Sequence, residues 1–260
     1  MNNKMIVWCG VLLTLLSWQT LADEVRTVTS PPHRVAVLEL YTSEGCSSCP
    51  PADRWLSKLR DVGISERQLA PLAFHVTYWD YIGWQDRFGQ KAFDRRQRET
   101  GRHNQLRTVY TPQFVLNGRD FRSYADFSQQ VRDINQQPAE VHLRLSVQRE
   151  TSSRYQVELR VDARQSALNE VVLYLALLEN DLQSQVDAGE NEGESLHHDY
   201  VVRSLTGPVR LRRPKTGGQL TVSFDIPADW RQPNMQLTGF AQNPDNGEIL
   251  QAVVMPLTVR

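Results

Sequence analysis

The spacing of apolar and polar positions along the chain predicts a strand, a helix and a second strand near its start. Residues 35–41 and 72–78 are short, nearly continuous apolar runs, which are typical of buried strands. Residues 52–61 carry apolar side chains at the spacing of one helix face. Because a strand, helix and strand in succession form a right-handed crossover, the two strands are expected to be parallel.

Farther along, a charged segment without proline predicts one or two exposed helices, interrupted near Gly101 and inserted at about 80–108. The next short strand ends at Asn117-Gly118, a pair that favours a tight hairpin turn. Residues 123–135 then repeat apolar positions with a helical period and predict an amphipathic helix.

From about residue 138 the pattern changes to short segments in which apolar and polar residues alternate. Such segments, separated by turn residues, predict an antiparallel β-sandwich. The sequence therefore predicts an α/β domain at 35–137, followed by an all-β sandwich domain at 138–260. An acidic stretch at 189–195 is expected to be a solvated loop.

The N-terminus has the features of a secretory signal peptide at 1–22. Lys4 precedes the apolar stretch Met5 to Trp18, and Ala22 stands just before a plausible cleavage point. The apolar stretch is short for a membrane span, so a retained anchor is the weaker alternative. A polar leader is expected at 23–34. The mature protein is then periplasmic or secreted, with no stable membrane insertion after cleavage.

Composition adds little to this picture but excludes some classes of partner. The 260 residues are 40% hydrophobic and 23% charged, which suits a globular protein of one or two domains. The formal net charge is −1, so nothing favours binding to nucleic acid.

The chain has three cysteines, and two of them form the motif Cys46-Ser47-Ser48-Cys49. Cys9 lies within the signal peptide and is expected to be lost on export. The remaining pair can close a disulfide in an oxidising compartment. That disulfide closes a very short loop, whereas a stabilising staple gains most from a long one. The pair is therefore interpreted as reactive.

The position of the pair between a strand and a helix assigns different roles to the two thiols. Cys46 is expected to be the more exposed, lower-pKa nucleophile, and Cys49 the thiol that resolves a mixed disulfide. The two serines between them can donate hydrogen bonds to a thiolate, whereas the charge of Glu44 is expected to raise a thiol pKa. Glu39, in the preceding strand, is a candidate acceptor for the proton of Cys49. The alternative is that Glu39 only caps backbone N–H groups.

Other candidate residues have both structural and functional interpretations. Tyr78 and Trp79 follow the end of a strand, where they either line a substrate groove or pack the inserted helices onto the sheet. His75 is expected to be a core residue. His197 and His198 begin a later strand, and nothing in the spacing brings either of them near Cys46.

The cysteine pair, together with Thr111-Pro112 before a later strand, resembles the thioredoxin superfamily. The resemblance implies a thioredoxin-like α/β domain with a helical insertion. It also implies that Pro112 follows a cis peptide bond and that Thr111 and Pro112 face the disulfide and bind the substrate backbone.

Within that superfamily the chain resembles the secreted bacterial "domain of unknown function 1223" family. The matching segments are Glu39 to Asp53, Tyr78 to Trp84, Tyr110 to Gln113 and His198 to Arg203. The resemblance implies a redox site but no particular substrate.

The predicted function is thiol–disulfide oxidoreduction through a Cys46–Cys49 disulfide. Its expected partners are exported protein thiols or disulfides and an unidentified redox partner, with no dissociable cofactor and no metal. One alternative is a copper-binding chaperone that uses the same thiols. The other is a non-enzymatic partner-binding module in which the disulfide is structural.

Overall fold

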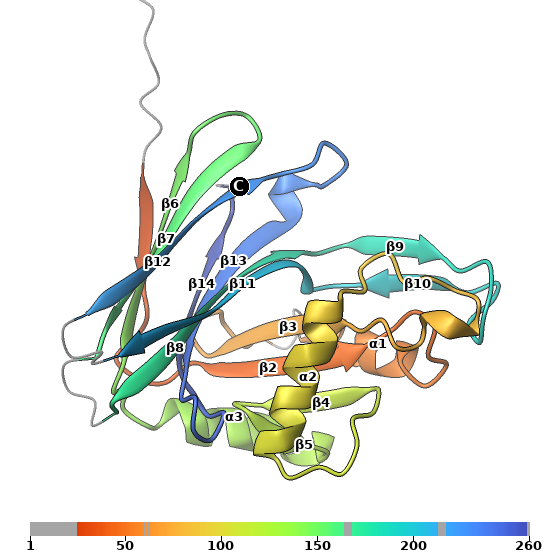
Figure 1. The fold of residues 1–260 in the computed structure, drawn as a ribbon, viewed down its shortest axis with the longest axis horizontal. Coiled ribbons are helices and arrows are strands. Elements are labelled where there is room, and N and C mark those ends of the chain that lie inside the picture. Colours follow the sequence, from red (N-terminus) through yellow and green to blue (C-terminus); the bar gives the residue numbers. More distant parts are fainter. Residues whose placement is uncertain (1–24, 60, 62, 164–167, 213–216, 259–260) are drawn as a thin grey trace, which may run out of the picture.

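A computed structural model of the protein describes residues 25–59, 61, 63–163, 168–212 and 217–258. Its strands form an eight-stranded mixed sheet, a separate four-stranded antiparallel sheet and a two-stranded hairpin (Figure 1). The described part has three α-helices, which are α1 (Pro50–Lys58), α2 (Lys91–His103) and α3 (Phe127–Asn135). The predicted mixture of α/β and antiparallel β structure is confirmed. The predicted signal peptide and Cys9 lie outside the described residues.

The mixed sheet has the strand order β14-β13-β8-β11-β3-β2-β4-β5. Its strands are β2 (Ala36–Thr42), β3 (Leu69–His75), β4 (Gln113–Leu116), β5 (Arg119–Phe121), β8 (Glu170–Glu179), β11 (Val201–Arg212), β13 (Met235–Gln242) and β14 (Ile249–Pro256). As predicted, β2 and β3 are parallel and α1 connects them. The β4–β5 turn has positive φ angles at Asn117 (50°) and Gly118 (85°), which confirms the predicted hairpin.

The four-stranded sheet consists of β1 (Arg26–Thr29), β6 (His142–Arg149), β7 (Arg154–Asp162) and β12 (Gly218–Asp225). Strand β1 lies in the segment expected to be a polar leader, and its backbone pairs with β6. Inward-facing apolar residues of this sheet pack against β8, β13 and β14 in one core. The layered packing of a β-sandwich is therefore present, but one of its layers belongs to the mixed sheet.

The mixed sheet contains strands from both sides of the domain boundary that the sequence suggested near residue 138. Strand β11 lies beside β3, and Val201 is the partner of Ala73. Without this pairing β3 would be an exposed strand edge, with unpaired backbone N–H and C=O groups. The two halves of the chain thus share a sheet, rather than forming an α/β body followed by an independent sandwich.

The helices cover both faces of β2 and β3. Apolar residues of α1 and α3 pack on one face, and Phe93 of α2 packs on the other. Contrary to the prediction, α2 is one helix that continues through Gly101, and one of its faces is buried. Among the described residues, none of the helices combines the length and apolar character needed to cross a bilayer.

Candidate active site

The cysteine pair lies where the chain leaves β2 and enters α1. Cys49 is the N-cap residue of α1, and Pro50 begins the helix at a position where a missing N–H costs nothing. The carbonyl oxygen of Cys49 accepts hydrogen bonds from the backbone N–H groups of Ala52 (2.9 Å) and Asp53 (3.1 Å). In the described part of the chain, Cys46 and Cys49 are both free thiols. The local sequence thus holds both thiols at a helix start.

Cys46 is in contact with a residue far away in the sequence. The Oγ1 of Thr111 donates a hydrogen bond to its Sγ at 3.3 Å, and the peptide bond between Thr111 and Pro112 is cis. The Oγ of Ser48 lies 3.3 Å from the same sulfur. The indole N–H of Trp79 donates to Thr111 Oγ1 at 2.7 Å and so holds that hydroxyl in place. The cis bond matches the prediction.

The pKa values of the two thiols are shifted in opposite directions. Hydrogen bonds to the sulfur of Cys46, from Cys49 first and then from Ser48 and Thr111, lower its pKa to about 6, although burial opposes this shift. Burial and the neighbouring Cys46 raise the pKa of Cys49 well above its usual value. At neutral pH Cys46 is therefore the thiolate and Cys49 remains protonated.

This acidity predicts the reaction of Cys46 with a small alkylating reagent. Because the thiolate is the reactive form, the rate should rise with pH and reach half its maximum near pH 6. Thr111→Val removes one hydrogen bond to the thiolate, so the midpoint should move upward by about one pH unit. The adduct at Cys46 is quantified by mass spectrometry. Thr108→Val, at an exposed threonine, serves as the control. An unshifted Thr111→Val midpoint would contradict the role of this hydroxyl.

The two thiols do not differ in exposure, contrary to the prediction for Cys46. Cys46 is 1% exposed and Cys49 is 0% exposed. The loop between β9 (Leu182–Gln185) and β10 (Ser195–His198) lies against the cysteine loop. Asn191 donates to the carbonyls of Glu44 (2.8 Å) and Cys46 (3.1 Å), and Glu190 accepts from the N–H of Ser47 (3.0 Å). Most residues of the acidic stretch at 189–195 are exposed, as predicted, but Asn191 and Glu190 fasten this loop to the site.

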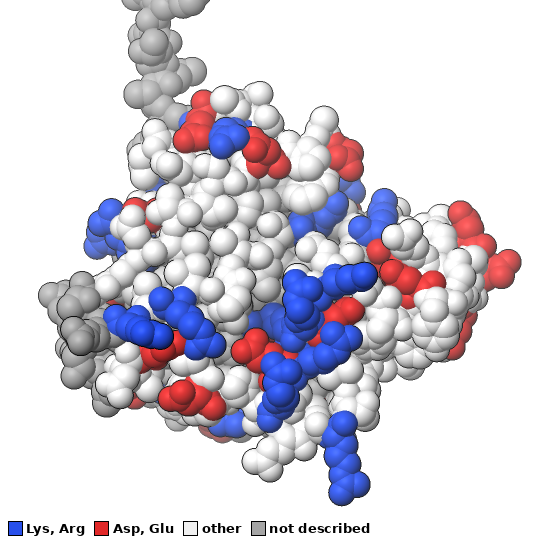
Figure 2. Space-filling model, in the orientation of Figure 1, with Lys and Arg blue, Asp and Glu red and all other residues white. Residues whose placement is uncertain are grey.

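Charged side chains are unevenly distributed around this region (Figure 2). Acidic side chains gather at the end of the molecule formed by the β9–β10 hairpin, and basic side chains lie along the outer face of α2. The acidic residues of the hairpin loop are Asp187, Glu190, Glu192 and Glu194. A reagent or client that approaches the cysteine loop from this side meets negative charge.

Glu39, the predicted proton acceptor, is occupied by another partner. Both of its carboxylate oxygens accept from the guanidinium of Arg96, at 2.9 and 2.7 Å, and Tyr41 donates to it at 2.7 Å. The side chain of Arg96 is 5% exposed and that of Glu39 is 1% exposed, so this is a buried ion pair. The guanidinium of Arg96 also stacks over the rings of Tyr174 and Phe240, at 4.6 and 5.0 Å. Glu39 therefore ties α2 to the sheet.

Asp53 is a buried carboxylate beside the cysteine pair that was not predicted as a site residue. Asp53 follows Cys49 by four positions, so both side chains lie on one side of the first helical turn. Its charge raises the pKa of Cys49. Burial raises the pKa of Asp53 itself, while Thr42 donates to its Oδ2 at 3.1 Å. An aspartate one turn into the helix after the motif was the available sequence signal.

Behind Asp53 lies a buried cluster of two histidines and two further carboxylates. His198 Nδ1 is 3.9 Å from Asp53 Oδ2, and His198 Nε2 is 3.3 Å from Glu44 Oε1. His75 Nδ1 lies 2.7 Å from Asp86 Oδ2, and the two imidazole rings meet edge to face at 4.9 Å. The fold therefore brings His198 next to the redox motif, which its sequence position did not suggest.

The charges in this cluster set the acidities of its members. Burial is the largest single influence on the Glu44 pKa and raises it, but the contact with His198, a hydrogen bond from Ser184 and the charge of His198 together lower that pKa. The pair of His75 and Asp86 likewise raises the pKa of the histidine and lowers that of the aspartate, against the effect of burial. Glu44 is thus engaged with His198 and with the indole N–H of Trp84 (2.9 Å). The predicted effect of its charge on the thiols is not among the main causes of their shifts.

The aromatic residues after β3 divide into packed and exposed groups. Tyr78 and Trp79 pack at the edge of the core that β2, β3 and β8 share, which agrees with the packing interpretation. Trp79 also stacks with Tyr81, with ring centres 6.5 Å apart, and the side chain of Tyr81 is 81% exposed. Trp79 and Tyr81 therefore connect Thr111 to an exposed aromatic surface.

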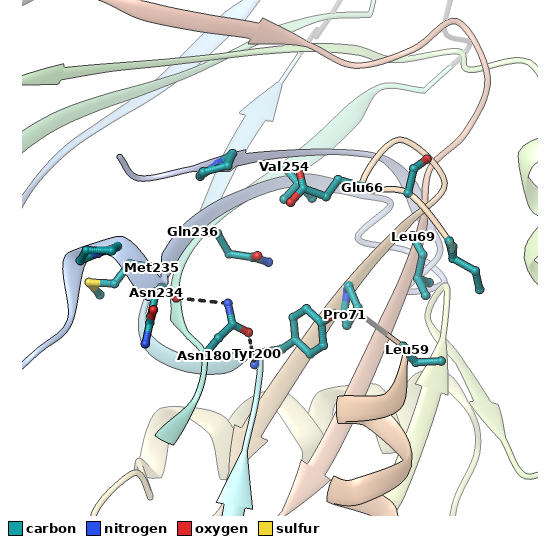
Figure 3. Close-up of a pocket in the computed structure, with 14 residues that line it drawn as sticks. Leu59, Glu66, Leu69, Pro71, Asn180, Tyr200, Asn234, Met235, Gln236 and Val254 are labelled. Carbon is teal, nitrogen blue, oxygen red and sulfur yellow. Dashed lines mark hydrogen bonds between the residues drawn. The ribbon is translucent and has the colours of Figure 1, made fainter. Parts of the chain in front are cut away.

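A separate pocket of about 380 Å³ lies at the opposite end of α1 (Figure 3). Leu59, Leu69 and Pro71 line one side, while Asn180, Met235 and Gln236 come from the other half of the chain. The residues that line it include none from the cysteine loop. This pocket is therefore not part of the candidate active site.

Comparison with known proteins places this arrangement among related folds. The profile of a family described as "Protein of unknown function (DUF1223)" matches residues 37–242. Protein AGR_C_4864 from Agrobacterium tumefaciens has a similar structure, with a TM-score of 0.63 and 23% identity over 89% of this chain and 98% of that one. HBP35 of Porphyromonas gingivalis has a TM-score of 0.65 and 14% identity over 87% of this chain and 76% of that one. Identities this low show a shared fold alone. No curated protein matches the chain.

Proposed function

The chain belongs to the DUF1223 family of proteins of unknown function, and we propose that it is an exported thiol–disulfide oxidoreductase acting on protein clients. The observation that supports this most directly is the contact of Cys46 with Thr111 Oγ1, beside a cis peptide bond, together with a Cys46 pKa of about 6. Such a thiol is ionised at neutral pH and is the reactive partner in disulfide exchange.

The fold around the site is consistent with a thioredoxin-like unit. Strands β2 and β3 are parallel across α1, β4 and β5 follow as an antiparallel pair, and the cis Thr111-Pro112 bond precedes β4. In the proposed interpretation, α2 is the helical insertion of that unit. The strands of the second half extend its sheet.

In the reducing direction, the Cys46 thiolate attacks a client disulfide. A bond forms between Cys46 Sγ and one client sulfur, and the other client sulfur leaves as a thiolate. Cys49 then loses its proton and attacks Cys46 Sγ, which closes the Cys46–Cys49 disulfide and releases the second client thiolate. In the oxidising direction a client thiolate attacks the Cys46–Cys49 disulfide at Cys46, and the same steps run in reverse. Electrons and protons balance with no bound cofactor.

Asp53 replaces Glu39 as the proposed acceptor of the proton from Cys49. Asp53 has no ion pair as tight as that between Glu39 and Arg96, and its charge acts on the pKa of Cys49. Burial raises the pKa of Asp53 from its usual range and so brings it nearer to that of a thiol. A carboxylate placed in this way can take the thiol proton as the second sulfur attacks.

Client binding is assigned to the surface beside Thr111. The backbone before Pro112 is proposed to pair with an extended client segment next to its cysteine. Trp79 orients Thr111 through the 2.7 Å hydrogen bond, and Tyr78 packs against the core of the sheet. The client is an exported protein thiol or disulfide, and the compartment is the periplasm or the medium.

Trapping of client proteins tests this function. Cys49→Ser removes the resolving thiol, so Cys46 should accumulate mixed disulfides with exported proteins in the producing cell. These adducts are detected as reducible bands and identified by mass spectrometry. A variant that lacks both thiols, Cys46→Ser with Cys49→Ser, is the control and should form none. Absence of adducts, with Cys46 shown to react with a small alkylating reagent, would overturn the proposal.

The copper-binding alternative rests on the two thiols alone, because no group of three or more His, Cys, Asp or Glu side chains among the described residues has the arrangement of a metal site. A partner-binding module with a structural disulfide is also less well supported, because it does not require the low pKa of Cys46.

A further inference from the structure

The buried cluster behind the cysteine pair contains a histidine that the proposed exchange reaction has not used. His198 stands at the end of β10, in the second half of the chain, and is 2% exposed. Its two ring nitrogens face different carboxylates, Asp53 at 3.9 Å and Glu44 at 3.3 Å. The imidazole of His198 therefore lies between two buried carboxylates, and its charge can act on both of them.

Asp53 needs such a partner if it is to accept a proton. Burial favours its protonated form, and a protonated carboxyl cannot take the proton of Cys49. The charge of His198 acts in the opposite direction and favours the carboxylate, as does the charge of His75 to a smaller extent. Thr42 also donates a hydrogen bond to Asp53 at 3.1 Å. His198 is thus a basic side chain within 4.0 Å of the Asp53 carboxylate.

The other charged groups around His198 belong to several elements. Besides Asp53 on α1 and Glu44 in the cysteine loop, His75 of β3 meets its ring edge to face, and Asp86 binds His75. The ring of Phe88 also packs against His198, at 5.8 Å, and carries the guanidinium groups of Arg87 and Arg203 on its surface, at 4.6 and 5.1 Å. Of these groups, only His198 contacts both Asp53 and Glu44 within 4.0 Å.

We propose that His198 is a positioning residue that keeps Asp53 ionised, so that the second half of the chain sets the pH at which Cys49 can resolve a mixed disulfide. This inference rests on the proposed exchange function. It gives a reason for the shared sheet and the β9–β10 hairpin, because together they place β10 beside α1 (Figure 1), and β10 ends at His198.

Single-turnover kinetics separate the reactions of the two thiols. The substrate is an aromatic disulfide that releases a coloured thiolate. In the first phase Cys46 attacks the reagent, forms a mixed disulfide and releases one coloured thiolate. In the second phase Asp53 takes the proton of Cys49, Cys49 attacks Cys46 Sγ, and the second coloured thiolate leaves. The first phase reports on the proposed function, and the pH profile of the second phase reports on His198.

His198→Gln should move the pH midpoint of the second phase upward by about one unit, because Asp53 loses the neighbouring positive charge and ionises at higher pH. The first phase should keep its rate within about threefold. His197→Gln is the matched control, since His197 is the adjacent histidine and is exposed. This control should leave both phases unchanged.

Asp53→Asn provides a second variant in case His198→Gln does not fold. Without an ionisable acceptor, the second phase should lose the pH dependence that the wild-type protein shows, while the first phase remains. A His198→Gln profile equal to that of His197→Gln, or an Asp53→Asn profile equal to the wild-type one, would overturn the inference and leave the proposed function intact. If the wild-type protein shows no first phase, the proposed function itself is overturned.

Discussion

Cys46→Ser is expected to abolish disulfide exchange, lowering its rate by about a thousandfold or more, as removal of a nucleophile does in other enzymes that use covalent catalysis. The serine hydroxyl keeps the size of the thiol but cannot form a mixed disulfide. The loss should be measured as reduction of a protein disulfide by the pre-reduced protein. Nothing else in the described part offers a second reactive thiol, because the pKa of Cys49 is strongly raised.

A neighbouring serine supplies the control for this experiment. Ser47 is exposed, and its backbone N–H bonds Glu190 rather than a cysteine. Ser47→Ala should therefore retain exchange within about threefold, since surface changes of this kind have small effects. Exchange that survives in Cys46→Ser would show that Cys49 reacts directly and that the assigned order of the two thiols is wrong.

Arg96→Met is expected to have the largest effect on stability. The substitution leaves the Glu39 carboxylate buried without its cation, and removal of one partner from a buried ion pair costs about 3–5 kcal/mol. It also removes the guanidinium from the rings of Tyr174 and Phe240. Denaturant unfolding should show a lower midpoint with an unchanged slope.

Two further variants distinguish the stability effect of the ion pair from the effect of a substitution elsewhere on the same helix. Arg98→Met lies on the exposed side of the same helix and should change the unfolding free energy by less than about 0.5 kcal/mol. Glu39→Gln combined with Arg96→Met removes both charges and keeps an acceptor for the Tyr41 hydroxyl, so this variant should be more stable than Arg96→Met alone. It should also retain exchange. Loss of exchange in this folded double variant would restore Glu39 as a candidate proton acceptor.

Much of the α/β half could be predicted from the sequence because its signals are local. The apolar runs of β2 and β3, the Asn117-Gly118 turn and the strand–helix order each depend on neighbouring residues. The cis bond before Pro112 came from a family resemblance, which carries information that no local pattern contains. The same resemblance pointed to the cysteine pair but not to the carboxylate beside it.

The errors concern contacts between distant parts of the chain. Glu39 has the burial expected of a proton acceptor, but its partner Arg96 lies on a helix that the sequence suggested was exposed. The acidic loop at 189–195 has the composition of a solvated segment, but Asn191 and Glu190 bind the cysteine loop. Composition reports the average preference of a segment for water, whereas a few specific hydrogen bonds decide where that segment lies.

The sequence alone therefore determined the reactive element of this protein, a Cys46–Cys49 pair between a strand and a helix, because its helix-start position depends on adjacent residues. Only the tertiary structure decided which groups surround that pair. The shared sheet brings His198 to Asp53, and α2 brings Arg96 to Glu39. The physical reason is that buried charges are stabilised by partners within a few ångströms in space, and separation along the chain does not reveal which residues will be that close.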